Sequence, residues 1–308
     1  VFYRPILFAA VAILSFSLLS GFGMLLVKIQ TNSQLTSQTV KGVRFALIIS
    51  LVAFAIGGHL LFSQASTNIS GSHLRFIDIH LTTAVFGFFG ALVIAISHQV
   101  LPMFYVAPEF PKFCRVWPSV IFAASLSLFI PIETVNIAAK IIIWTAMLAF
   151  GVVALKKIKE RKRLLSDASL KLWQAGLISL LAGLVAWAID AIFGLADREF
   201  LFALFFGLGF LGSIVKAMSN KIVPFLAWFH LANSGRWDAP SVREMITDKS
   251  ANVELYLHLA SIFLFLASIF FYPIFMIASL FAAASFLVLG VNIVKTVRIY
   301  KNELTKAA

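Results

Sequence analysis

Residues 76–107 read FIDIHLTTAVFGFFGALVIAISHQVLPMFYVA, and Asp78 is the only charged residue among them. About twenty apolar residues are enough to cross the hydrocarbon core of a membrane as a helix. The rest of the chain has the same character, because 61% of its 308 residues are hydrophobic and 12% are charged. This composition excludes a soluble or disordered protein, and the single cysteine, Cys114, excludes an internal disulfide scaffold. We therefore predict an all-α membrane protein.

Apolar windows bounded by polar residues divide the chain into nine predicted transmembrane helices. They are residues 5–27, 44–63, 76–107, 117–134, 135–155, 172–196, 200–231, 252–272 and 273–295. Pro102 and Pro224 lie near the ends of the two longest windows, where a kink or an exit from the membrane is expected. We treat residues 1–308 as one transmembrane helical domain, with a basic loop at 156–171 and a polar loop at 232–251.

The distribution of Lys and Arg between the loops gives the predicted orientation. Nineteen of these residues fall on one side of the membrane and four on the other, while Lys216 and Lys221 lie inside the seventh window. Cytoplasmic loops are enriched in Lys and Arg, so the carboxyl terminus is predicted to be cytoplasmic and the amino terminus external. That start, with Val1 as first residue, favours a fragment lacking an odd number of upstream helices, and a natural external amino terminus is the alternative. The same rule explains the net charge of +12 without a nucleic-acid partner.

Residues 87–102 and 209–224 match each other at a constant offset of 122. The identical pairs include Gly87 with Gly209, Gly90 with Gly212, Ser97 with Ser219 and Pro102 with Pro224. We interpret the match as an internal four-helix repeat, parallel about an axis along the membrane normal. Chance is the alternative, because glycine is common in membrane helices.

Ionisable residues inside the predicted spans are the main chemical signal, because they are costly there unless paired or functional. His59 and His80 lie at similar depths in the outer leaflet, with Asp78 and Asp190 at comparable levels. Two histidines oriented by carboxylates are typical of a heme or copper site. The same residues, with Lys216, also suit a proton path. The plainer alternatives are an interfacial Asp78, a hydrogen bond from His59 to a backbone carbonyl, and a structural hydrogen bond at Asp190.

A second group of histidines, His98, His230 and His258, lies toward the cytoplasmic side, near Lys216 and Lys221. A second metal site there is conceivable, but placement at the membrane interface explains the residues better. The motifs of zinc proteases, phosphate-binding loops and serine hydrolases are missing from the sequence. Catalytic residues therefore cannot be named, and an enzymatic activity is left open.

Residues 98–111, HQVLPMFYVAPEFP, and 221–231, KIVPFLAWFHL, resemble a family of bacterial inner-membrane proteins labelled as permeases. That family is distantly similar to subunit I of heme-copper oxidases and nitric oxide reductases, whose fold has twelve helices in three arcs of four. Three missing helices would make the third span here equivalent to oxidase helix six, whose outer half carries a copper-ligand histidine, as His80 does. The seventh span departs from the pattern, since its outer half carries phenylalanines, namely Phe202, Phe205 and Phe206.

The sequence and the resemblance together predict a protein of the bacterial cytoplasmic membrane that binds heme b or copper at His59 and His80. It would serve respiratory, nitric-oxide or metal-handling metabolism and electron transport, with a redox partner or other membrane subunits. The alternatives are a proton-coupled transporter that uses His80, Asp190 and Lys216, and a structural subunit of a membrane complex.

Overall fold

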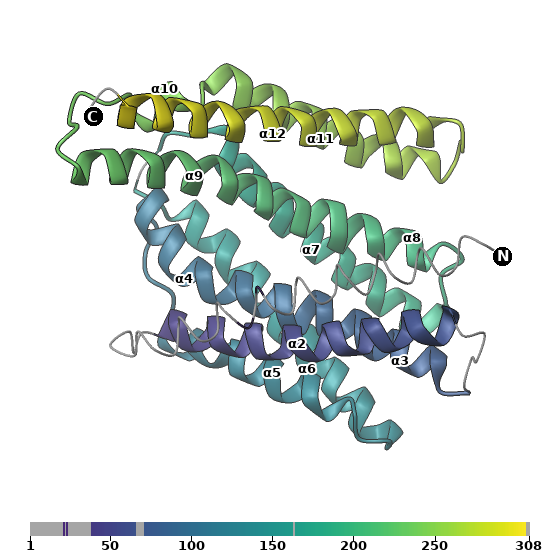
Figure 1. Ribbon diagram of the computed structural model, residues 1–308. Coiled ribbons are helices and arrows are strands. Elements are labelled where there is room, and N and C mark those ends of the chain that lie inside the picture. The colour runs from purple at the N-terminus through teal and green to yellow at the C-terminus, as the bar shows by residue number, and fades with distance from the viewer. Residues whose placement is uncertain (1–20, 22, 24–37, 66–70, 163, 306–308) are drawn as a thin grey trace. The chain divides into compact units, whose positions relative to one another are not determined.

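The computed structural model describes residues 21, 23, 38–65, 71–162 and 164–305 (Figure 1). These ranges are almost entirely helical and contain no β-strand. Seven helical segments within them have the length and composition to cross a membrane. They are Thr39–Gln64, His73–Tyr105, Glu133–Lys159, Ala168–Phe193, Arg198–Asn233, Asp248–Ser268 and Ile274–Thr305. The prediction of an all-α membrane protein is therefore confirmed.

Seven of the nine predicted windows correspond to these segments. The first window, residues 5–27, lies outside the described residues apart from Gly21 and Gly23. The fourth, residues 117–134, contains the short helix α5 (Trp117–Ser127), which at 1.5 Å per residue spans about 16 Å. That length is roughly half of a hydrocarbon core. The exact number of crossings therefore stays a prediction.

Hydrogen bonds from side chains explain why α5 ends well before residue 134. Arg75 Nη2 donates to the carbonyl oxygens of Leu128 and Phe129, at 3.3 and 3.1 Å. Asn136 Nδ2 donates to the carbonyls of Ile130 and Ile132, at 3.1 and 3.0 Å. These donors bind carbonyls at the end of α5 and in the turn that leads to α6 (Glu133–Lys159), and so stabilise the turn.

The helices group into two compact units, residues 1–163 (unit 1) and 164–308 (unit 2). The long described helices of unit 1 start with α2 (Gln38–Ala65), which is followed by a long span. That span consists of α3 (His73–Thr82), the π-helical segment η1 (Thr83–Gly90) and α4 (Ala91–Tyr105). The 3-10 turn η2 (Lys112–Val116) leads into α5. Within the unit, α2 packs against η1 and α4, and α5 packs against α6 (Figure 1).

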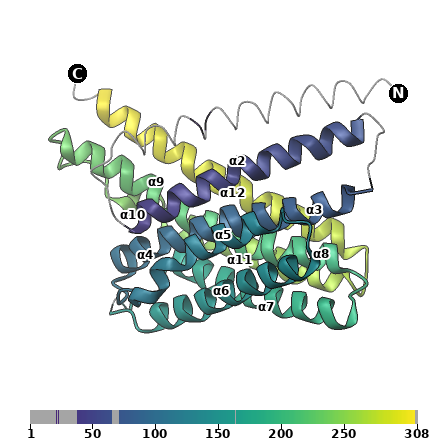
Figure 2. The same cartoon turned by 90° about the horizontal axis from the view of Figure 1, so that it is seen from below.

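Unit 2 likewise has a long helix followed by a span that contains a π-helical segment. It begins with α7 (Ala168–Phe193), followed by a span made of α8 (Arg198–Phe202), the π-helical segment η3 (Ala203–Gly212) and α9 (Ser213–Asn233). The short α10 (Val242–Met245) precedes α11 (Asp248–Ser268) and α12 (Ile274–Thr305). Helix α7 packs against η3 and α9, while α12 contacts both α11 and α9 (Figures 1 and 2). Helices α9, α11 and α12 thus surround a common interior.

The two π-helical segments end at equivalent positions of the sequence repeat, Gly90 and Gly212. A Cβ atom added to Gly87 would lie 2.7 Å from Ser125 Oγ, and one added to Gly209 would lie 2.6 Å from Ser179 Cβ. Both glycines therefore allow a neighbouring helix to approach closely. Prolines do not stop either helix at once, because α4 continues three residues beyond Pro102 and α9 continues nine residues beyond Pro224.

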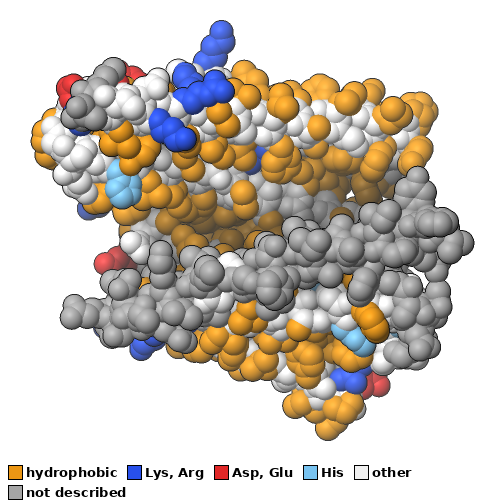
Figure 3. Space-filling view, in the orientation of Figure 1, with side chains coloured by type: hydrophobic (Ala, Val, Ile, Leu, Met, Phe, Trp, Pro, Cys, Tyr) orange, Lys and Arg blue, Asp and Glu red, His pale blue; other side chains and the backbone are white. Residues whose placement is uncertain are grey.

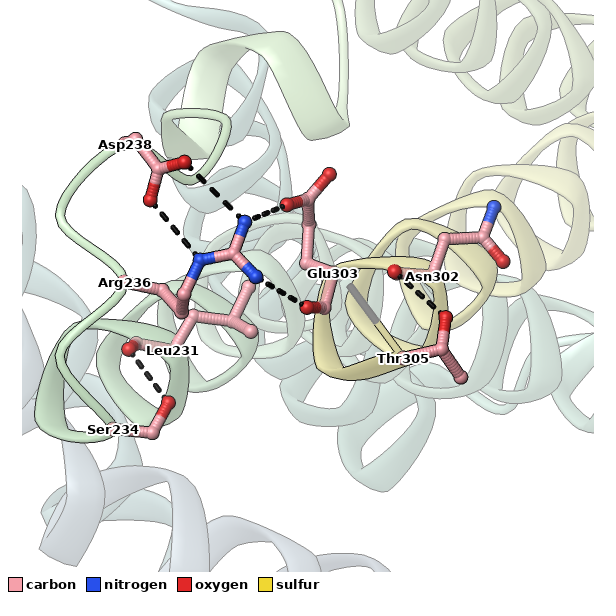
Figure 4. A network of polar contacts seen from close by, with 7 residues as sticks. All are labelled: Leu231, Ser234, Arg236, Asp238, Asn302, Glu303 and Thr305. Carbon is pink, nitrogen blue, oxygen red and sulfur yellow. Dashed lines mark hydrogen bonds and ion pairs between the residues drawn. The ribbon is translucent and has the colours of Figure 1, made fainter. Parts of the chain in front are cut away.

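Arg236 connects the polar loop after α9 to the end of α12 (Figure 4). Its guanidinium group donates to the Glu303 carbonyl oxygen and to Glu303 Oε2, both at 2.7 Å, and its Nε atom donates to Asp238 Oδ1 at 3.1 Å. Hydrogen bonding to Asp238 is the main reason that the pKa of Arg236 is raised. The network fixes the loop at one end of unit 2.

The surface matches a protein that contacts a lipid bilayer. Hydrophobic side chains cover most of the helices visible in Figure 3, and Lys and Arg side chains gather toward the end of unit 2 where α12 terminates. The exposed residues of α12 include Met276, Leu280 and Leu287. In the basic loop, hydrogen bonding to Lys157 lowers the pKa of Glu160. Apolar helix faces with charged ends are the pattern expected of membrane spans.

Candidate functional site

A column of polar side chains runs through the interior of unit 2 along one face of α11. Ser250, Glu254, His258 and Ser261 are spaced by four, four and three residues, which places them on one side of the helix. The last three have no exposed surface. Glu254 lies six residues after the start of α11, about 9 Å along the helix axis. The column therefore reaches from one end of α11 into its middle.

Two helices, α9 and α12, supply the hydrogen bonds to Glu254 of α11. Its Oε2 atom accepts from Asn220 Nδ2 of α9 at 3.1 Å and from Asn292 Nδ2 of α12 at 3.5 Å. Asn292 is oriented in turn by Ser250, whose Oγ atom donates to Asn292 Oδ1 at 2.6 Å. One carboxylate oxygen is thus held by two amide groups, and the other faces Lys216.

Lys216 lies near the middle of the span Arg198–Asn233 and has no exposed surface. Its Nζ atom is 3.9 Å from Glu254 Oε1, beyond hydrogen-bond distance, and 3.6 Å from the centre of the Phe286 ring. An ammonium group above an aromatic ring is held by a cation–π interaction. Lys216 therefore contacts a carboxylate from α11 and an aromatic face from α12.

His258 extends the site toward the π-helical segment. Its Nε2 atom forms a 2.8 Å hydrogen bond with Ser213 Oγ, at the first residue of α9 after η3. A Cβ atom added to Gly212 would lie 3.5 Å from His258 Cε1, so the imidazole packs against the end of η3. The polar column and the π-helical turn are therefore in direct contact.

Four buried polar atoms of this site have no hydrogen-bond partner among the residues that the structure describes. They are Lys216 Nζ, Asn220 Oδ1, Glu254 Oε1 and His258 Nδ1. Buried polar groups are nearly always hydrogen-bonded, and each unpaired group costs about 1–3 kcal/mol. Four such atoms within one buried polar site mark a place where a proton or a small ligand can bind.

The two histidines of the predicted cofactor site contact different neighbours in unit 1. His80 Nδ1 is 3.0 Å from the Ala53 carbonyl oxygen, and a Cβ atom added to Gly57 would lie 2.9 Å from His80 Cε1. His59 instead packs edge-to-face on Phe76, with ring centres 5.2 Å apart. Nowhere in the described part of the chain do three or more His, Cys, Asp or Glu side chains form a group that could hold a metal ion. The heme or copper site stays a prediction.

The two carboxylates assigned to that site bind other groups. Asp78 pairs with Lys140, whose Nζ atom is 2.8 Å from Asp78 Oδ2. Asp190 belongs to unit 2, where its Oδ1 atom accepts a hydrogen bond from the Leu195 backbone N–H at 2.9 Å, just after the end of α7. The second contact is the structural hydrogen bond considered for Asp190 from the sequence.

The second group of predicted histidines divides between the two units. His98 lies in unit 1, where its ring packs on Phe110 with centres 4.7 Å apart. His230 is an exposed residue of α9, about 25 Å along the helix axis from Ser213, the partner of His258. Lys221 pairs with Asp167, the residue that caps the start of α7, at 2.5 Å. Of this group, His258 belongs to the polar column on α11, and Lys216 on α9 contacts the column at Glu254.

Several residues of the site were not predicted from the sequence, among them Asn220, Glu254 and Asn292. Glu254 had a usable signal, because it is the only charged residue within the predicted span 252–272 and precedes His258 by four residues. The two asparagines had none, since their role depends on contacts across 34 and 38 residues of sequence.

Comparisons of the chain with models of protein families, with curated proteins and with solved structures find no match in any of the three. The resemblance to permease-labelled proteins and to oxidase subunits therefore stays a prediction. The buried polar contacts of unit 2 are therefore the basis for a functional proposal.

Proposed function

We propose that this protein is a membrane transporter that couples the movement of a solute to protons, and that Lys216 and Glu254 carry the proton. The observation that supports the proposal is an ionisable pair without exposed surface, on two membrane-length helices, with Nζ and Oε1 3.9 Å apart. Ionisable residues within membrane spans mark proton and ion pathways in pumps and transporters. The resemblance implies a bacterial inner membrane, and the distribution of Lys and Arg predicts that the carboxyl end of α12 is cytoplasmic.

The geometry of the pair favours a functional role over a purely structural one. A buried ion pair offsets its desolvation only when its geometry is excellent and its remaining atoms are hydrogen-bonded. The ion pairs Lys140–Asp78 and Arg236–Glu303 have short nitrogen-to-oxygen distances, 2.8 and 2.7 Å. Lys216–Glu254 is longer and leaves Nζ and Oε1 without hydrogen bonds. A loosely held pair of this kind can lose or gain a proton with little rearrangement.

The π-helical segment η3 gives the site a means of coupling to helix movement. π-helical turns occur frequently at functional sites, and η3 ends beside Ser213 and His258. Conversion of such a turn to α-helix would rotate α9, with Lys216, relative to α8. We propose that this movement changes the side of the membrane to which the pair is open, within a parallel four-helix repeat.

The experiment uses inverted membrane vesicles that contain the full chain and are energised to hold a pH gradient. Solutes of different classes, namely inorganic cations, carboxylates, amino acids and sugars, are added while a dye reports the gradient. We expect one class to dissipate it with the wild type and with Asp78→Asn, which removes an exposed carboxylate, but not with Glu254→Gln. The proposal fails when no class has an effect or when Glu254→Gln behaves like the wild type.

A heme or copper site at His80 is the second candidate. The contact between His80 Nδ1 and the Ala53 carbonyl favours it, because metal-bound histidines usually donate their other ring N–H to such an acceptor. Nε2 would then carry the free lone pair and serve as ligand. His59, in contact with Phe76, does not share this arrangement, so the residues fit a single histidine ligand better than a two-histidine centre. Bound heme or copper would supply electron-transfer chemistry.

An optical spectrum of the purified full chain, with iron and copper analysis, tests this candidate. We expect stoichiometric metal, and with heme a Soret band, in the wild type and in His59→Ala, and neither in His80→Ala. Metal-free wild-type protein prepared from cells supplied with heme and copper would reject the candidate.

A further inference from the structure

The surroundings of Lys216 Nζ are those of a cation site. A carboxylate oxygen, Glu254 Oε1, lies 3.9 Å away, and the face of the Phe286 ring lies 3.6 Å away. A second oxygen without a hydrogen-bond partner, Asn220 Oδ1, belongs to the side chain that holds Glu254. Carboxylate and amide oxygens bind hard cations, and aromatic faces attract any cation. The lysine ammonium group thus occupies a place where an inorganic cation would find suitable contacts.

The charged groups around this place are few. Glu254 and His258 are the titratable residues that α11 turns toward Lys216, and α12 contributes the neutral Asn292 and the Phe286 ring. The acidic residues of α7, which packs against α9, are Asp167 and Asp190 near its two ends, where they bind Lys221 and the Leu195 N–H. The charge balance of the site therefore depends on Lys216 and Glu254.

Charge neutrality decides what can replace the proton of Lys216. The buried pair has no net charge when the lysine is protonated and the glutamate ionised. When an N–H bond of Lys216 breaks, the electron pair stays on Nζ and the proton leaves to water, so an uncompensated carboxylate remains in a low-dielectric interior. A monovalent cation bound at Glu254 Oε1 and Asn220 Oδ1 restores neutrality. A divalent cation would leave an excess positive charge.

We propose that the space between Lys216, Glu254 and Asn220 is a binding site for a monovalent inorganic cation such as Na⁺, which exchanges with the Lys216 proton. This inference rests on the proposed transport function and names its solute class. Because the neutral sum is kept, one proton leaves for each cation that binds, and the exchange moves no net charge.

An anion is less well suited to the same site. To bind one while keeping neutrality, Glu254 would have to be protonated. Its Oε2 atom already accepts two amide N–H groups, from Asn220 and Asn292, an arrangement that suits an ionised carboxylate. Two of the four unpaired atoms of the site, Glu254 Oε1 and Asn220 Oδ1, are oxygens, which repel anions.

The first measurement is proton release from the purified full chain in weakly buffered detergent solution when NaCl, LiCl or KCl is added. Choline chloride at the same ionic strength is the control salt. We expect about one proton per chain with at least one of the three salts in the wild type and in Asp78→Asn, and none with choline. Glu254→Gln and Lys216→Met should release none.

Single variants leave an unpaired buried charge and can misfold, so the double variant Lys216→Met with Glu254→Gln is the decisive control. It removes both charges and is expected to fold with a thermal stability at or above that of the wild type. The bound cation should raise the melting temperature of the wild type in proportion to the logarithm of its concentration, and leave the double variant unchanged. Equal release or equal stabilisation in the double variant would overturn the cation site.

The two proposals can fail separately. When none of the three salts acts on the wild type but a carboxylate, amino acid or sugar still drives proton movement that depends on Glu254, the cation site is wrong and transport stands. When no solute of any class drives such movement, both proposals are wrong.

Discussion

In the described residues, each unit has a long helix followed by a span with a π-helical interruption, yet the two units bury different chemistry. Among the described residues, the fully buried polar side chains of unit 1 are serines and threonines, such as Thr83 and Ser97. Unit 2 buries a lysine, two glutamates, a histidine and two asparagines in addition. Among the described residues, the fully buried polar groups of unit 1 are thus hydroxyl groups, whereas unit 2 also buries ionisable groups.

The offset of 122 between the halves shows where they diverge. Lys216 corresponds to Ile94 and Ser213 to Ala91, and both residues of unit 1 are buried and apolar. The glycines that precede these positions are kept, together with the π-helical turns that end at Gly90 and Gly212. The π-helical turn and its glycines are therefore common to both halves, whereas buried ionisable side chains are, among the described residues, specific to unit 2.

The largest effect is expected when the charge is placed in the apolar half. Ile94→Lys would bury an ammonium group in unit 1. The buried residues described in that unit include no carboxylate that could pair with it, as Glu254 pairs with Lys216. An unpaired buried charge costs several kcal/mol, against a total stability of about 5–15 kcal/mol. We expect little folded protein, measured as the monodisperse fraction after extraction in detergent. Ile94→Met, which keeps the volume, should behave like the wild type, and normal yields of Ile94→Lys would contradict the contrast.

Removal of the charges from unit 2 should have a smaller and non-additive effect. Lys216→Met or Glu254→Gln alone leaves one buried charge, and breaking such a pair typically costs about 3–5 kcal/mol. The double variant should regain most of that loss, because neither charge remains. Thermal unfolding of the four proteins in one detergent gives the coupling between the two residues. Additive losses would show that the side chains do not interact as the 3.9 Å distance indicates.

Much of the fold was predictable because hydropathy and helix length are local properties. The predicted window 172–196 corresponds to α7 at Ala168–Phe193, and 135–155 lies within α6 at Glu133–Lys159. The short α5 was not predictable, since its end depends on Arg75 reaching carbonyl groups more than fifty residues away in sequence.

The site was harder to predict than the fold. The predicted depth of each histidine in the membrane favoured His59 and His80 as ligands and assigned His258 to the membrane interface. Depth does not reveal which side chains face one another. The contacts of Glu254 with α9 and α12 arise only when three helices assemble, and they make His258 and Lys216 part of one cluster.

The close approach of neighbouring helices can be tested at the paired glycines. Gly87→Ala and Gly209→Ala each introduce a Cβ atom closer than 3.0 Å to a neighbouring serine, and overpacking of this kind costs about 1–3 kcal/mol. The nearest atom to Gly87 is Ser125 Oγ, so Ser125→Ala should rescue Gly87→Ala. The nearest atom to Gly209 is Ser179 Cβ, so Ser179→Gly should rescue Gly209→Ala and Ser179→Ala should not. Melting temperatures of these variants distinguish the two contacts, and equal rescue by both alanine substitutions would contradict the assigned geometry.

The smallest effects are expected at the ion pairs near the ends of the units. Asp78→Asn breaks a pair whose side chains are 33% and 50% exposed, and such pairs contribute about 0–1 kcal/mol. Glu303→Gln weakens a less exposed contact with Arg236, which also holds the Glu303 carbonyl, and should cost about 1–2 kcal/mol. The loss should shrink in high salt for Asp78→Asn and persist for Glu303→Gln, because burial limits screening. Thermal unfolding at low and high salt measures both. A larger loss of stability for Asp78→Asn than for Glu303→Gln would contradict this order. The polar contacts of unit 1 would then contribute more to stability than their exposure indicates, and the contrast between the two halves would be weaker.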